Sequence, residues 1–358
     1  MTRDYSHFLP PAGDGDTTPS ARSGLAALGW QPFFAQQIGI EDLTKTPPVR
    51  VVEVHRNGLH ILGDGVDQLV PPGPAATVGD WLLLDKDQPT ESAVLHRKSL
   101  FKRRAPGTDR RLQLIAANVD TAFIVTSCNQ DFNLARLERY VALAFEAEVT
   151  PVIILTKSDL CDDPSSFEQA ASTLSERVLA LSINALGPEP RTKLREWCKP
   201  GQTIAFLGSS GVGKSTLVNA LMQDQRVETA PIRQEDGRGR HTTTRRQLYF
   251  LPNGCAILDT PGMREIQLAD VQKGIADVFD DLAALAENCR FNDCMHQTEP
   301  GCAIQLAVKN GDIPQDRLRR WTKLVAEERF NATSLVRRKS EGKALRKTIR
   351  ALQKRNQK

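Results

Sequence analysis

The sequence has no apolar run approaching the roughly eighteen residues that a membrane span requires. Its start, MTRDYSHFLPPAGDGDTTPS, lacks an apolar core behind a positive charge, so it does not resemble a secretory signal. The seven cysteines are odd in number and widely scattered except for the last three, which argues against a disulfide framework. We therefore expect a cytoplasmic, multidomain monomer with no membrane association, and with reduced thiols or a metal site.

Charge is distributed unevenly, although the total is only +4. Residues 316–358 contain fifteen Lys and Arg but four Asp and Glu, so this end carries +11 and the first 315 residues carry −7. Such asymmetry is expected of a polyanion-binding extension on an otherwise acidic enzyme. A solvated, partly helical tail without a partner is the alternative.

The first hundred residues change in character near position 48. Residues 1–47 begin rich in Gly, Pro, Ser and Thr, and we expect this N-terminal extension to be partly disordered. Over 48–100, short β-like runs are separated by an Asn-Gly pair at 57–58 and an Asp-Gly pair at 64–65, both strong hairpin signals. About five strands suit a small barrel of the OB type, and an SH3-like barrel fits the pattern nearly as well.

A basic connector, residues 97–104, follows this barrel, and it either touches phosphates or only keeps a linker soluble. Over residues 101–271 near-continuous apolar strands then alternate with helices, one of which we expect from about Asn133 to Ala147. This alternation predicts an α/β domain with a parallel sheet covered by helices on both faces. A ligand would bind at the carboxyl ends of its strands.

The segment GSSGVGKST lies between an apolar strand, TIAFL, and the helical sequence TLVNALM, which is the context of a phosphate-binding P-loop. Backbone N–H groups and the helix N-terminus would face the phosphates. Lys214 would reach the β and γ oxygens, and Ser215 would hold Mg²⁺. The residues predicted to bind the phosphates are Gly208, Ser209, Ser210, Gly211, Val212, Gly213, Lys214, Ser215 and Thr216.

Two further segments fit a nucleotide switch. Asp259 ends the apolar strand CAIL, where it would bind Mg²⁺ directly or through water, and the amide of Gly262 would sense the γ-phosphate. The preceding GRGRHTTT could complete the Mg²⁺ shell with one threonine hydroxyl when triphosphate is bound. The sequence does not separate Thr242, Thr243 and Thr244, and we take the central Thr243 as the candidate.

The tetrapeptide TKSD, which comprises Thr156, Lys157, Ser158 and Asp159, follows the strand PVIIL. The Asp159 carboxylate can accept hydrogen bonds from N1–H and the exocyclic amine of guanine, a donor pair that adenine lacks. The stem of Lys157 can lie along the base. These residues predict GTP and GDP as ligands, with amides near Ser182 at a further strand end contacting the base edge.

Three thiols and an imidazole occur close together in NCRFNDCMHQTEPGCAI. A set of Cys289, Cys294, His296 and Cys302 suits structural zinc, because four protein ligands leave no open position for catalysis. Buried thiols without metal are the alternative. The other cysteines have no such partners and are expected to be core or surface thiols: Cys128, Cys161, Cys198 and Cys255.

The base motif precedes the phosphate loop, whereas in Ras-like GTPases it follows, so the order is circularly permuted. With these motifs the sequence resembles the ribosome-associated RsgA (YjeQ) GTPase family over roughly residues 48–330. The resemblance implies an OB barrel, a permuted GTPase domain, a mostly helical domain with one Zn²⁺, and action in late maturation of the small ribosomal subunit. The domains are expected at 48–100, 101–271 and 272–335, with a basic tail at 336–358 that would bind ribosomal RNA.

Two positions depart from related patterns. Met263 stands where Ras-like enzymes place the glutamine that orients the attacking water, so slow intrinsic hydrolysis accelerated by the ribosome is expected. His241 is the nearest candidate to position that water, although it could equally bind RNA phosphate or nothing. Ile183 replaces the family's usual alanine, and because its guanine contact is through the backbone, recognition should survive.

Three functions therefore compete. The leading hypothesis is a Mg²⁺-dependent GTPase that docks on the small ribosomal subunit. A GTP-sensing RNA-binding module with little turnover is the second, and Lys214, Ser215 and Asp259 argue against it. An ATP-dependent kinase is the third, and it is disfavoured by Asp159.

Overall fold

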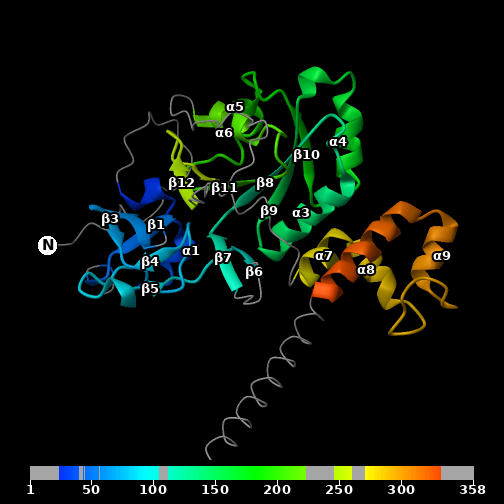
Figure 1. Cartoon of the computed structure of the whole chain (residues 1–358), viewed down its shortest axis with the longest axis horizontal. Coiled ribbons are helices and arrows are strands. Elements are labelled where there is room, and N and C mark those ends of the chain that lie inside the picture. The colour runs from blue at the N-terminus through cyan, green and yellow to red at the C-terminus, as the bar shows by residue number, and fades with distance from the viewer. Residues whose placement is uncertain are drawn as a thin grey trace, which may run out of the picture. The chain divides into compact units, whose positions relative to one another are not determined.

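The computed structural model describes residues 24–39, 43, 45–55, 57–104, 112–222, 246–259 and 271–331 (Figure 1). The chain divides into two compact units, residues 1–266 and 267–358, which are described separately. Within these described ranges, no helix combines the length and apolar character needed to cross a membrane.

The first unit is built on a mixed sheet whose central strands are parallel. The strand order β10-β9-β8-β11-β13 is parallel throughout, and β12 then pairs antiparallel with β13. Every residue of β8 and β11 is buried, as the apolar runs predicted. The strands are β8 (Thr121–Ser127), β9 (Thr150–Thr156), β10 (Leu179–Ile183), β11 (Thr203–Leu207), β12 (Arg246–Phe250) and β13 (Ala256–Asp259).

Helices cover both faces of this sheet, with α3 and α4 on one side and α5 and α6 on the other (Figure 1). The helix predicted near 133–147 is confirmed as α3. It begins there because the Asn133 side chain accepts a hydrogen bond from the backbone N–H of Arg136 and so caps the helix start. The helices are α3 (Leu134–Glu146), α4 (Pro164–Ser172), α5 (Glu189–Lys193) and α6 (Lys214–Met222).

A smaller set of strands precedes this sheet, over the residues where a barrel is expected. The loop residues 64–65 connect β2 to β3, and β1 pairs with both β2 and β4. Trp30, Phe34 and Trp81 pack together beside these strands. The elements are η2 (Leu25–Leu28), α1 (Pro32–Ala35), β1 (Pro48–His55), β2 (Gly58–Gly63), β3 (Val66–Val70), β4 (Trp81–Leu83), η3 (Pro89–Glu91) and β5 (Ala93–Val94).

The two sets of strands form one continuous sheet, because β1 pairs antiparallel with β12 through Glu53 with Gln247 and Val54 with Arg246. The basic connector also contributes structure. Part of it forms strand β6 (Leu100–Arg104), which pairs with β7 (Leu112–Ala117) in a separate two-stranded sheet.

Two residues of the connector form ion pairs within the protein. The Arg97 guanidinium donates to both oxygens of the fully buried Asp80 carboxylate, at 2.7 and 2.9 Å. The Lys98 ammonium pairs with Asp120, the residue before β8. Burial raises the pKa of Asp80, and the bond to Arg97 opposes that shift by favouring the charged form. Arg97 thus ties the connector to the N-terminal strands, and Lys98 ties it to the residue before β8.

The fully buried Arg50 of β1 is a further polar link between the N-terminal strands and the larger sheet. Its guanidinium donates to the Thr203 hydroxyl of β11 at 2.7 Å and to the Leu28 carbonyl at 2.5 Å. It also lies 5.7 Å from the centre of the Trp81 ring. Burial lowers the pKa of Arg50 to about 10, which still leaves it charged at neutral pH. The strand that leads into the phosphate loop is therefore anchored to β1.

We expect Arg50→Ala to lower the free energy of unfolding of the first unit by about 2–4 kcal/mol, because it leaves the Leu28 carbonyl and the buried Thr203 hydroxyl without this donor. Urea denaturation measures this loss. Arg195→Ala, which removes an exposed arginine, should change the unfolding free energy by less than about 0.5 kcal/mol. Equal effects of the two substitutions would contradict the anchoring role.

The second unit is helical around a small apolar core. Its elements are α7 (Gln272–Val278), α8 (Asp280–Glu287), α9 (Ala303–Asn310) and a further helix over 315–331. Phe279, Leu282 and Ile304 are almost fully buried. The Arg317 guanidinium lies 5.0 Å from the Phe279 ring and makes two 2.8 Å bonds to the Asp281 carboxylate.

Candidate functional site

The phosphate loop joins β11 to α6, as its sequence predicts. Gly208 has φ 138°, and a Cβ there would stand 2.2 Å from the Val125 carbonyl oxygen of β8. Gly213 has φ 95°, and its Cβ would lie 3.3 Å from the Thr156 hydroxyl. Close packing against two neighbouring strands, together with positive φ, therefore requires glycine at both positions.

Lys214 opens α6, and its side chain folds back over the loop. The ammonium donates to the Gly208 carbonyl at 2.8 Å and also to the Ser209 carbonyl. Only 8% of the residue is exposed. The ammonium, the loop amides and the N-terminus of α6 together make this end of the sheet favourable for phosphate.

The base motif begins at the end of β9 and meets the phosphate loop directly. The buried Thr156 hydroxyl lies 2.6 Å from the Val212 carbonyl oxygen and 3.0 Å from that of Thr126. Lys157 adopts the left-handed conformation, with φ 58°, and turns the chain into η4 (Ser158–Leu160). Thr156 therefore bonds within the protein, while Lys157 and Asp159 follow it on the turn.

Ser182 lies on β10 beside the base motif, where Ile183 pairs with Thr156. The Ser182 backbone N–H donates to the Glu168 carboxylate at 2.5 Å, and the Ser182 carbonyl accepts from the Lys193 ammonium at 2.8 Å. The structure thus brings this strand end next to TKSD, and gives the Ser182 amide itself a partner on α4. Its predicted contact with a base stays a prediction.

Several predicted residues lie outside the described part of the chain. These are His241, Thr242, Thr243, Thr244, Gly262 and Met263, together with the side chain of Asp259. The backbone of β13 runs parallel to β11 and ends at Asp259. Since parallel strands end at the same edge of a sheet, Asp259 is placed on the edge that carries the phosphate loop.

Arg136 is a neighbour of the phosphate loop that sequence reasoning missed. It belongs to the first turn of α3, and its guanidinium donates to the Ser209 hydroxyl at 2.8 Å. The position of Arg136 near the phosphate loop could be predicted in part, since a helix beginning after Asn133 starts at the carboxyl edge of the sheet. Its contact with Ser209 joins residues 73 positions apart, which spacing does not reveal.

We expect Thr156→Val to weaken GDP binding by roughly tenfold, because an unpaired Val212 carbonyl costs about 1–2 kcal/mol and loosens the phosphate loop. A fluorescent GDP titration measures the dissociation constant. Thr150→Val, at the exposed first residue of the same strand, is the control and should leave it unchanged. Unaltered affinity in the Thr156 variant would show that the hydroxyl does not support the site.

The second unit contains the predicted metal ligands in one cluster. One ligand atom from each of Cys289, Cys294, His296 and Cys302 lies within 4.8 Å of all the others. The His296 Nδ1 atom is 3.5 Å from the Cys289 sulfur and 3.6 Å from the Cys302 sulfur. Four such groups converging from one loop and two helix ends fit a tetrahedral Zn²⁺ ion.

The loop that carries these ligands is held by its own hydrogen bonds. The Glu299 carboxylate accepts from the backbone N–H groups of Met295, Gln297 and Thr298, at 2.8–3.0 Å. These backbone bonds, including one from its own N–H, lower the pKa of Glu299 to about 2. The Gln305 side chain donates to the His296 carbonyl at 2.6 Å. The cluster is therefore built by the fold around it.

We expect one zinc ion per chain, lost in Cys302→Ser together with helical signal from the second unit, because structural zinc contributes directly to folding. Metal analysis and circular dichroism measure both. Cys161→Ser, a half-buried cysteine of the first unit, is the control and should keep its zinc. Zinc retained in full by the Cys302 variant would rule out this ligand set.

The remaining cysteines are thiols, as expected: Cys128, Cys198 and Cys255 are buried and Cys161 is half-buried. Cys198 and Cys255 lie beside each other. A hydrogen bond from Cys198 and burial raise the pKa of Cys255 far above its usual value, so the Cys255 sulfur stays protonated and unreactive at neutral pH.

Comparison with protein families gives two matches. The family model described as RsgA GTPase matches residues 94–269, a range that contains the base motif and the phosphate loop. A model described as ABC transporter matches residues 193–350, and this range also contains the phosphate loop, a motif common to many nucleotide-binding proteins.

Curated relatives match over most of the chain. The protein named small ribosomal subunit biogenesis GTPase RsgA 2 of Vibrio parahaemolyticus is 47% identical over 339 residues, which cover 94% of each chain. The RsgA of Mesorhizobium japonicum is 44% identical and covers 88% of this chain and 93% of its own.

Two solved structures share the fold. YjeQ of Thermotoga maritima aligns with a TM-score of 0.58 at 24% identity, covering 78% of this chain and 97% of its own. YloQ, described as a circularly permuted GTPase, aligns with a TM-score of 0.52 at 20% identity, covering 79% and 94%.

Proposed function

This chain belongs to the RsgA family of GTPases, and from this membership we propose that it binds the small ribosomal subunit and acts in its late maturation. The observation that carries the proposal is the permuted site. TKSD, which begins at the end of β9, precedes the phosphate loop in the chain, yet the two meet through the Thr156 hydroxyl and the Val212 carbonyl. The small subunit is proposed as the partner because the relatives are named small ribosomal subunit biogenesis GTPases.

The nucleotide is GTP or GDP with Mg²⁺. In the site that we propose, Lys157 and Asp159 hold guanine, and the loop of residues 208–216 surrounds the phosphates. Ser215 and Asp259 would hold Mg²⁺, which supplies positive charge to the transferred phosphoryl group. Lys214, already inside the loop, stabilises the charge that develops as the bond to the γ-phosphate breaks.

Stimulation by the subunit follows from the missing glutamine. Met263 has a thioether that cannot orient water, so basal hydrolysis is slow and the bound subunit completes or reorders the site. His241 is the candidate to position water, and Thr243 the candidate to complete the Mg²⁺ shell. Substrate selection and phosphate binding need neither residue.

Docking involves the remaining parts of the chain. We assign residues 48–100 to the OB class because β1 pairs with both β2 and β4, and we assign zinc to the Cys₃His cluster. The +11 of residues 316–358 suits ribosomal RNA phosphates. The protein would act in the cytoplasm as a monomer.

We expect purified small subunits to raise GTP turnover by roughly a hundredfold, the scale of a correctly positioned catalytic group, and large subunits to leave it unchanged. Phosphate release measures the rate. Lys214→Ala should abolish turnover in both conditions. If small subunits bind without raising the rate, the chain is a GTP-sensing RNA-binding module, and if they do not bind, the proposed partner is wrong.

A further inference from the structure

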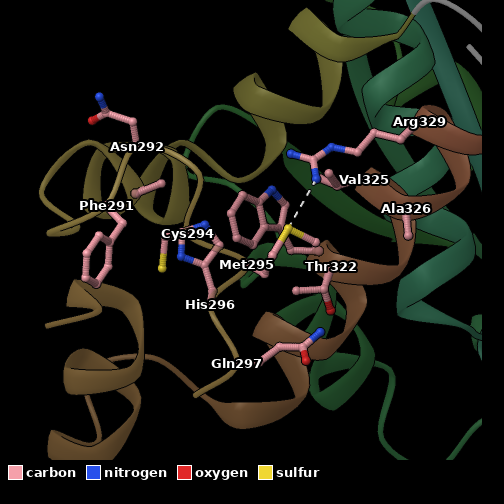
Figure 2. Close-up of a pocket in the computed structure, with 12 residues that line it drawn as sticks. Phe291, Asn292, Cys294, Met295, His296, Gln297, Thr322, Val325, Ala326 and Arg329 are labelled. Carbon is pink, nitrogen blue, oxygen red and sulfur yellow. Dashed lines mark hydrogen bonds between the residues drawn. The ribbon is translucent and has the colours of Figure 1, made fainter. Parts of the chain in front are cut away.

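A hollow of about 550 Å³ lies in the second unit beside the Cys₃His cluster, lined only by residues of that unit. One wall comes from the metal-binding loop and the other from the helix over 315–331 (Figure 2). Its size is within the range of sites that enclose small organic ligands. The zinc ligands account for only one side of it.

Aromatic and thioether side chains form its apolar surface. The Trp321 and His296 rings lie 5.3 Å apart at 39°. Phe291 is 40% exposed and Met295 is 52% exposed, and both are large apolar side chains that a packed core would cover. The hollow thus offers flat, apolar rings to a ligand from solvent.

Polar groups at this surface can both donate and accept. Asn292 and Gln297 carry amides, and Figure 2 shows the Arg329 guanidinium reaching toward Met295, whose sulfur accepts from it at 3.7 Å. The Arg290 guanidinium lies 5.5 Å from the Phe291 ring centre. No residue lining the hollow in this part of the described chain is acidic. Amides beside exposed rings match the edge and face of a nucleobase.

Charge selects the class of partner. The helix over 315–331 that forms one wall carries five Lys and Arg and three Asp and Glu, a net charge of +2, and Arg290 adds a further cation beside Phe291. A polyanion satisfies that charge, and RNA is the polyanion whose bases also stack on aromatic side chains. We propose that this hollow receives an unstacked RNA base, which stacks on Phe291 or Trp321 while Arg290 and Arg329 face the adjoining phosphates. This inference rests on the proposed binding of ribosomal RNA.

The test compares two probes with the full zinc-bound chain: a single-stranded RNA of about twelve nucleotides and a ribose-phosphate strand of equal length without bases. Phe291→Ala should weaken RNA binding by roughly 5- to 150-fold and leave the abasic strand unaffected, because only stacking is lost. Phe291→Tyr, which keeps the ring, should bind RNA as the parent does. Fluorescence anisotropy measures all affinities.

Leu306→Ala is the matched control, since it truncates an apolar side chain that is 59% exposed on α9 and outside the hollow. It should change neither affinity. Ala326→Leu narrows the hollow without removing a ring and should also weaken only the RNA with bases. Zinc content and circular dichroism confirm that each variant is folded.

Equal weakening of both probes, or parental affinity for RNA in both hollow variants, would overturn the proposal. The proposal would also be overturned if the hollow variants lost binding to a ribosomal protein while keeping the parental affinity for RNA. The hollow would then hold a protein segment. Stimulation of GTP turnover by small subunits is measured separately on the parent chain. Absence of this stimulation would count against the proposed function. Base-dependent RNA binding instead tests whether the hollow receives a base.

Discussion

The nucleotide site depends on the close contact between two strand ends, made by the Thr156 hydroxyl and the Val212 carbonyl. A parallel sheet presents the carboxyl ends of all its strands at one edge, whatever order the strands have in the chain. The segments predicted to bind the base and the phosphates therefore meet here, although their order along the chain is reversed relative to Ras-like GTPases. The permutation changes the connections and leaves the geometry of the edge intact.

The same sheet extends into the N-terminal strands, so the smaller β structure is attached to the nucleotide-binding domain at several points, and two of them involve β1. The β1–β12 pairing joins it to the strand after the predicted switch, and Arg50 joins it to the strand before the phosphate loop. Both attachments lie on elements adjacent to phosphate-binding segments. Strand β1 therefore contacts elements on both sides of the phosphate loop in the sheet.

Much of this architecture could be predicted from local patterns. The alternation of apolar strands and helices indicated the parallel sheet, Asn133 indicated the start of α3, and the cysteine spacing indicated the metal cluster. Arg50 could not be predicted, because it lies in an apolar strand and its partner Thr203 is 153 residues away. The pairing of Arg97 with Asp80 and the hollow beside the cluster likewise depend on distant segments packing together.

The Cys₃His cluster links the end of α8 to the start of α9, and the loop between them also forms a wall of the hollow. A metal held there fixes that wall, including Phe291 and Met295. The phosphate loop belongs to the other unit. If zinc occupies the cluster, as we propose, metal supply also sets the shape of this wall, and a metal-starved cell would lose the hollow without any change in the sequence.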